Sequence, residues 1–163
     1  MRGIEFEVVW SDEDLIEYYV RCANGDFCGA TKMYSGHNDL KSAADVLKGF
    51  PQHLQDARII ELGAFESNAA GGGIHLQFYC VDSVGHAVTL VKLRNDGCKT
   101  IGEPESVCLR IPVQAGAIDS LFSASSFAGC HVRSKGVPRY GGSLDWARRC
   151  LANNQINRIK RRQ

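Results

Sequence analysis

The stretch HLQFYCVDSVGHAVTLVKL, His75–Leu93, decides the fold because it carries reactive residue types inside the pattern of a β-hairpin. A turn over Asp82–Gly85 would pair Cys80 with Ala87. In this register the apolar residues of both strands share one face: Ile74, Leu76, Phe78, Cys80, Ala87, Thr89, Val91 and Leu93. A slip of one residue would turn every side chain to the other face. Because both alternations agree on one register, the stretch predicts an antiparallel hairpin.

The same register argues against a reactive site in this hairpin. His75 and His86 lie on the outward face, roughly 20 Å apart along the strand direction at ~3.3 Å per residue. Zinc ligands must converge within ~2.0–2.3 Å of one ion, and Cys80 points to the opposite face. We therefore predict no metal site, no cofactor and no Cys–His nucleophile here. A pair from distant segments, such as Cys108 with His53, stays open.

The outward face of the hairpin is more apolar than a solvated sheet face should be. It places Tyr79 beside Val88 and Gln77 beside Leu90. Either a helix at 38–48 covers this face, or the face binds a partner. The helix is the favoured cover, and the four residues are the candidate partner-binding site if it is absent.

Two further hairpin strands are predicted near the N-terminus. IEFEVVW alternates so that Ile4, Phe6, Val8 and Trp10 point to one side. After the polar turn SDED, Ile16, Tyr18, Val20 and Cys22 share a face in the same way. Asn24-Gly25 then predicts a two-residue type I′ turn, which would pair Cys22 with Phe27.

The segment SGHNDLKSAADVLKGF changes to helical spacing, with Leu40, Ala43, Ala44 and Leu47 on one stripe. Ser35 or Asn38 is the expected cap, and Gly49 followed by Pro51 ends the helix. Strands are again expected over 58–65 and 106–113. Pro112 lacks a backbone N–H, so the second of these strands belongs at a sheet edge or a bulge.

These elements predict an α+β fold with a mostly antiparallel sheet of about seven strands, one helix near 38–48 and helical structure towards the C-terminus. Residues 1–123 form a single domain in this prediction, and 124–163 form a linker and a basic tail that is helical in part. No apolar run approaches the ~20 residues of a membrane span. The N-terminal stretch carries acids, unlike a signal peptide. We therefore expect a cytoplasmic protein without a membrane partner, in which the seven cysteines are free thiols.

Charge divides the chain into an acidic body and a basic tail. From His131 onwards nine bases face one acid, a net charge of +8, whereas the first 130 residues hold seventeen acids and ten bases, a net charge of −7. We expect the tail to dock on an acidic body, either its own or that of a second copy in a homodimer. The docking residues would be an apolar stripe and two arginines: Leu144, Trp146, Leu151, Arg148 and Arg149.

Several segments together resemble a family of small bacterial proteins, some of which are similar to immunity proteins of Wap-type contact-dependent toxins. The segments are FEVVWSDEDLIE, NGDFCGATKMY, LKGFPQHLQDARIIELGAF, LQFYCVDSVGHAVTLVKL and SVCLRIPVQAGAID. The resemblance implies a non-catalytic protein that occludes a toxin, and it supplies no catalytic residue. It ends at about Phe127, so the tail suggests a recombined ending of the kind carried by mobile gene cassettes.

Three functions follow from these observations. The first is a binding protein, most concretely an immunity-type inhibitor of a toxin partner. The second is a small hydrolase-like enzyme whose site is not visible in the sequence. The third is nucleic-acid binding through the basic tail, whose charge suits phosphate contacts but which lacks interleaved aromatic residues for stacking. We favour the first and expect no enzyme.

Overall fold

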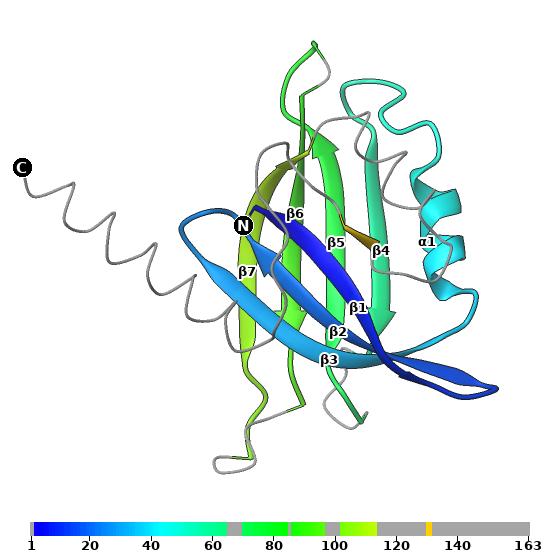
Figure 1. The fold of residues 1–163 in the computed structure, drawn as a ribbon. Helices are drawn as coiled ribbons and strands as arrows, with labels where there is room; N and C mark the ends of the chain where they lie inside the picture. The colour runs from blue at the N-terminus through cyan, green and yellow to red at the C-terminus, as the bar shows by residue number, and fades with distance from the viewer. Residues whose placement is uncertain (1, 65–69, 85, 97–101, 114–129, 132–163) are drawn as a thin grey trace, which may run out of the picture.

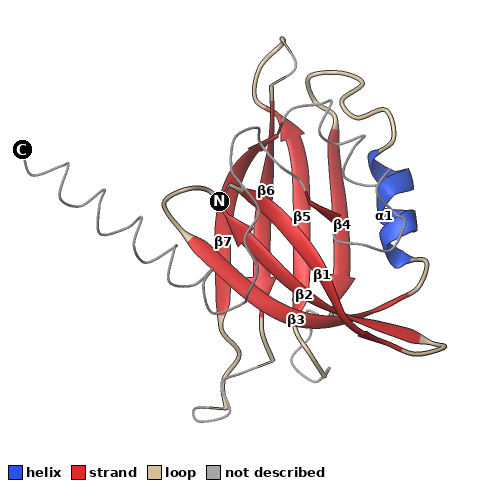
Figure 2. Cartoon of the chain, viewed as in Figure 1, coloured by secondary structure: helices blue, strands red, loops and turns tan. Residues whose placement is uncertain are grey.

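Two four-stranded antiparallel sheets and one helix make up the described part of the chain (Figures 1 and 2). The computed structural model describes residues 2–64, 70–84, 86–96, 102–113 and 130–131. One sheet has the order β3-β2-β1-β8 and the other β4-β5-β6-β7. The elements in chain order are β1 (Gly3–Ser11), β2 (Leu15–Ala23), β3 (Cys28–Gly36), α1 (Asp39–Leu47), β4 (Ala57–Gly63), β5 (Gly73–Cys80), β6 (Ala87–Arg94), β7 (Ser106–Val113) and β8 (Cys130–His131).

This architecture confirms the α+β prediction with mostly antiparallel strands and a helix near 38–48. The short strand β8 lies past the expected domain boundary at 123 and pairs with β1. The expected C-terminal helix lies outside the described residues. No helix in the described part of the chain combines the length and apolar character needed to cross a lipid bilayer.

The predicted β5–β6 hairpin forms in the expected register. Cys80 pairs with Ala87, and His75 pairs with Lys92. The N–H of Val81 donates to the carbonyl of His86 at 2.9 Å and closes the turn. The inward-facing residues are buried and form one half of the core: Ile74, Leu76, Phe78, Ala87, Thr89, Val91 and Leu93.

The facing sheet contributes core residues from β1 and β2, together with Met33 of β3. Ile16, Tyr18, Val20 and Cys22 are buried, as their alternation predicted. The ring of Phe6 meets that of Tyr18 edge-on at 6.1 Å between centroids. Burying such aromatic and aliphatic side chains stabilises the fold by roughly 1.5–3 kcal/mol each.

The second half of β1 departs from the prediction. Val8 and Trp10 were expected to point inward, yet 45% and 48% of their surfaces are exposed. A register irregularity between these two residues interrupts the pairing of β1 with β2 and disturbs the alternation. Figure 1 shows that this end of the β1–β2 hairpin projects beyond β4, where no second sheet covers it.

The β2–β3 turn is also wider than predicted. Ala23 pairs with Cys28, so four residues rather than two form the loop. The reason is the Asn24 side chain, whose Oδ1 accepts the N–H groups of Asp26 and Phe27 at 3.1 and 2.9 Å. This side-chain turn competes with the type I′ geometry. The pairing of β2 with β3 is shifted by two residues from the predicted register, so the same side chains of β3 still point inward. Phe27, however, lies in the loop and is 65% exposed.

β3 crosses the ends of the second sheet at very short range (Figure 1). The N–H of Gly72 donates to the carbonyl of Lys32 at 2.7 Å, and the hydroxyl of Thr31 donates to the carbonyl of Arg94 at 2.9 Å. A Cβ added at Gly72 would lie 2.0 Å from Thr31 Oγ1 and 2.3 Å from the Arg94 oxygen. The two sheets can approach this closely only because residue 72 has no side chain.

The helix α1 packs at the β4 edge and joins the core between the sheets. Ala43 and Leu47 are buried, and Arg58 Nη1 donates to the carbonyl of Val46 at 3.1 Å. Arg58 shares the inward side of β4 with the buried Ile60. The expectation that this helix covers the outward face of the β5–β6 hairpin is therefore wrong. The apolar stripe of the helix packs into the core, on the inward side of the β4–β7 sheet.

The start of α1 is fixed differently from the prediction. Asn38 is the cap residue but makes no side-chain cap bond. Instead, the Asp39 carboxylate accepts the hydroxyl of Ser35 at 2.8 Å and the N–H of Gly36 at 2.7 Å. The first helical residue thus reaches back and ties the helix to the end of β3.

Asp56 anchors the segment between α1 and β4. Its carboxylate accepts the N–H of Gln52 at 2.9 Å and receives Arg58 Nε at 2.6 Å and Nη2 at 2.9 Å. The hydrogen bonds from Arg58, then from Gln52, lower the pKa of Asp56 from 3.8 to about 2. The charged form is therefore the one that holds this segment.

We expect Gly72→Ala to lower the free energy of unfolding by about 2–3 kcal/mol, because overpacking a tight contact costs this much. Gly36→Ala is the matched control, since the three atoms nearest to its added Cβ all belong to the exposed Asp39 carboxylate, at 3.3–3.4 Å, rather than to the backbone. Urea unfolding of both variants is the measurement. Equal losses in the two variants would contradict the tight crossing.

Asp56→Asn should destabilise the protein at pH 7 and flatten its pH dependence in acid. Since the folded pKa of about 2 lies below the unfolded value of 3.8, the stabilisation is present above about pH 4 and disappears as pH falls towards 2. Unfolding midpoints measured from pH 6 to pH 2 report this component. Asp45→Asn, at an exposed helix position, should keep the wild-type profile; an unchanged profile in Asp56→Asn would contradict the anchor.

Candidate protein interface

The predicted partner-binding residues lie together on the outer side of the β4–β7 sheet. Tyr79 pairs with Val88 and Gln77 with Leu90, as expected. All four are half-buried, because neighbouring strands flank them. The neighbouring strands add three residues to this surface: Ile59 of β4 pairs with Gln77, and Arg110 and Pro112 of β7 pair with Leu90 and Val88. We call the surface formed by these seven residues the outer face.

The outer face combines apolar side chains with a polar border. Ile59 on β4 is 54% exposed, and Arg110 and Pro112 on β7 are exposed at the opposite edge. Tyrosine and arginine are enriched in protein interfaces because they join large contact area to hydrogen-bonding capacity. The composition suits binding of a protein surface.

A row of polar residues crosses the sheet beside the outer face. Glu61, His75, Lys92 and Cys108 are successive cross-strand partners on β4, β5, β6 and β7. His75 Nδ1 lies 2.7 Å from Glu61 Oε1. Cys108 stands two strands away from His75, about 10 Å at the spacing of neighbouring strands. A Cys–His nucleophile requires the imidazole and the thiol to lie within hydrogen-bond distance of each other. The separation of His75 from Cys108 is too large for this.

His86 and Asp82 form a second pair, at the β5–β6 turn. Asp82 Oδ1 accepts the N–H groups of Val84 and His86 at 3.1 Å each, and Oδ2 lies 2.5 Å from His86 Nδ1. The bond from His86 lowers the pKa of Asp82. Since the His86 side chain is 74% exposed and Asp82 binds the backbone of the turn, the pair stabilises the turn rather than a site.

Cys80 and His53 meet through the backbone. The Cys80 thiol donates to the carbonyl of His53 at 3.7 Å. The pair of Cys108 with His53, which the sequence left open, is not among the recorded hydrogen bonds and ion pairs of the described residues. Within the described ranges, no group of three or more His, Cys, Asp or Glu side chains could hold a metal ion.

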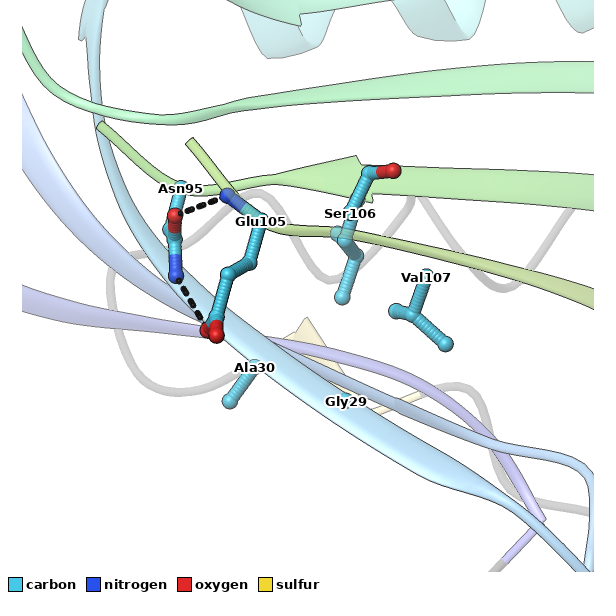
Figure 3. A pocket seen from close by; sticks show the side chains of 7 residues that line it. Gly29, Ala30, Asn95, Glu105, Ser106 and Val107 are labelled. Carbon is cyan, nitrogen blue, oxygen red and sulfur yellow. Dashed lines mark hydrogen bonds between the residues drawn. The ribbon is translucent and has the colours of Figure 1, made fainter. Parts of the chain in front are cut away.

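A small pocket lies where β3 meets the β6–β7 turn (Figure 3). Its volume is about 170 Å³, below the ~300–1,000 Å³ usual for organic ligands. Asn95 Oδ1 accepts the N–H of Glu105 at 2.8 Å, and Asn95 Nδ2 donates to Glu105 Oε2 at 3.4 Å. These polar groups bind each other across the turn, and Figure 3 shows them turned together at the pocket's edge.

The projecting end of the β1–β2 hairpin, residues 8–15, forms a second candidate surface, which we call the tip. Val9 and Leu15 are 43% and 42% exposed, beside the similarly exposed Val8 and Trp10. Sequence reasoning missed the tip because strict alternation placed Val8 and Trp10 inside. The run VVW, which breaks the alternation directly before the polar turn SDED, is the signal that would have found it.

The tail-docking residues lie outside the described part of the chain. These are Leu144, Trp146, Arg148, Arg149 and Leu151. The described residues that precede them most closely along the chain are those of β8, where Cys130 and His131 pair with Phe6 and Glu5 of β1. Docking of the tail therefore stays a prediction.

The cysteines should differ sharply in reactivity. Cys108 is exposed, whereas Cys22 is fully buried. We expect iodoacetamide to alkylate Cys108 within minutes in the native protein and to reach Cys22 only after unfolding, as measured by mass spectrometry of the tryptic peptides. Comparable labelling of the two at early times would contradict the packing of β2.

Comparison with known proteins gives no match: no family model, no curated protein and no solved structure matches the chain. The resemblance to immunity proteins therefore stays a prediction.

Proposed function

We propose that the protein is a non-catalytic binding protein, most concretely an immunity-type inhibitor that occludes a toxin partner. The observation that carries the proposal is the outer face of the β4–β7 sheet. Here Ile59 is more than half exposed, and α1, the one helix among the described residues, packs on the opposite side of the sheet. An apolar sheet face with a polar border is a typical protein-binding surface.

The geometry of the outer face supports binding to a broad surface rather than to a small ligand. Tyr79, Leu90 and Arg110 project from three different strands of one rigid sheet. Residues held by a sheet lose little conformational freedom on binding, which favours affinity. A central tyrosine and arginine are also the residue types that most often dominate binding energy.

Charge supports a basic target. The first 130 residues carry a net charge of −7, and complementary charge accelerates association with a basic partner. A toxin that acts on nucleic acid has such a basic surface. The proposal places the inhibitor in the cytoplasm, where reducing conditions keep exposed thiols such as that of Cys108 reduced.

The test uses the product of the neighbouring open reading frame as the candidate toxin. Calorimetry measures its complex with this protein, and a growth assay measures whether co-expression relieves toxicity. Ile59→Glu should weaken the complex at least tenfold, because it buries an unpaired carboxylate in an apolar contact. Val84→Glu is the matched control at a 77% exposed position of the β5–β6 turn and should bind as wild type.

The two variants should unfold at wild-type urea concentrations, since both positions are exposed. If the product of the neighbouring open reading frame is not toxic and does not bind this protein, the proposed immunity function is wrong. If it binds tightly and Ile59→Glu leaves the affinity unchanged, the outer face is not the interface.

A further inference from the structure

The tip has a chemistry that differs from that of the outer face. We infer that it is a docking element that enters a positively charged cleft with an apolar floor on a protein partner. This inference rests on the proposed function as a binding protein and adds to it a second surface and the chemistry of the partner.

Apolar exposure is concentrated at the tip. Between 42% and 48% of the surface of Val8, Val9, Trp10 and Leu15 is exposed. These four residues fall within eight positions of sequence and two paired strands. Tryptophan is the residue type most enriched among binding hot spots, and it contributes most when it fills a pocket of the partner. A projecting hairpin with an exposed tryptophan therefore suits a concave surface.

Negative charge surrounds this apolar group. Asp12, Glu13 and Asp14 form the turn itself, and no hydrogen bond or ion pair joins the side chains of Glu13 and Asp14 to another described residue. Below the tip the carboxylates have cationic partners, because Arg21 binds both Glu5 and Glu7 and Lys32 binds Glu17. Glu13 and Asp14 stand at the far end of the hairpin, where they would meet a partner first.

The tip is held in one shape before it binds. Asp12 Oδ1 accepts the N–H groups of Asp14 and Leu15 at 2.9 and 2.8 Å, and the N–H of Asp12 donates to the Leu15 carbonyl at 3.0 Å. From outside the hairpin, His37 Nε2 lies 2.8 Å from the Asp12 carbonyl and donates to it. A preformed turn spares the entropy of ordering on binding.

These features select a basic protein over other partners. Phosphate backbones would be repelled by the three carboxylates of the turn. The chain's own basic segment begins at β8, which runs antiparallel to β1 with His131 opposite Glu5 and Cys130 opposite Phe6. At β8 the chain therefore runs towards Gly3 and away from the tip. A cationic cleft on another protein fits both the charge and the projection.

Photo-crosslinking in the cells that naturally produce the protein tests the inference. p-Benzoylphenylalanine would replace Trp10 in the tip, Ile59 in the outer face, or Val84 as an exposed control. We expect the Trp10 position to crosslink one protein with a basic cleft, identified by mass spectrometry, and the Val84 position to give no such adduct.

The captured protein is then purified and its affinity measured. Trp10→Ala should weaken the complex at least tenfold. The variant Asp12→Asn/Glu13→Gln/Asp14→Asn keeps the side-chain acceptor that forms the turn, so it should fold normally and also bind at least tenfold more weakly at low salt. This second difference should shrink at 1 M salt, where the screening length is ~3 Å. Val84→Ala is the control and should bind as wild type.

Three results would overturn the inference: no adduct from position 10, an adduct only with residues 131–163 of this chain or with nucleic acid, or unchanged affinity in both tip variants. Adducts from position 59 report on the proposed function separately. An adduct from position 59 without one from position 10 leaves that function standing and removes the tip. The absence of adducts at both positions removes both.

Discussion

The close crossing of β3 over the start of β5 and the end of β6 is the contact on which the rest of the structure depends. Two hydrogen bonds made across it, from Gly72 to Lys32 and from Thr31 to Arg94, join the two sheets directly. The crossing sets the distance and the angle between the sheets. With these fixed, the inward residues of both sheets meet in one core, and α1 fills the opening at the β4 edge.

That arrangement also determines which surfaces stay available. Because α1 lies at the edge and contributes to the core, it does not lie over the outer face. Because β1 and β2 are longer than the sheet they cross, their far end leaves the core and becomes the tip (Figure 1). Both exposed apolar surfaces are thus consequences of one packing geometry. They carry different chemistry, since arginine borders one and carboxylates border the other.

The sequence predicted those elements whose local pattern admits one solution. The β5–β6 register followed because two alternations had to agree, and the α1 stripe followed from its spacing. The β2–β3 turn was wrong because the Asn24 side chain accepts two backbone N–H groups and widens the loop, which a preference for Asn-Gly cannot show. The exposure of Trp10 and the role of Gly72 depend on where one sheet ends over the other. A tertiary arrangement of this kind produces no periodic pattern in the sequence. The outer face was found as an apolar excess, whereas the tip was hidden by the assumption that apolar alternation means burial.

The position of β8 has a consequence for the order in which the protein can be completed during synthesis. β1 leaves the ribosome before the other described strands, and β2 pairs with one of its edges soon afterwards. Its other edge is paired by residues 130–131, which follow more than a hundred residues later. At ~5–20 residues per second the nascent chain keeps that edge open for on the order of ten seconds. Open strand edges attract other strands. Once β2 has paired, one guanidinium, that of Arg21, binds the two carboxylates of Glu5 and Glu7, so these three side chains keep a net negative charge. Hairpins of neighbouring nascent chains that carry this same charge repel each other, which protects the open edge until β8 pairs with it.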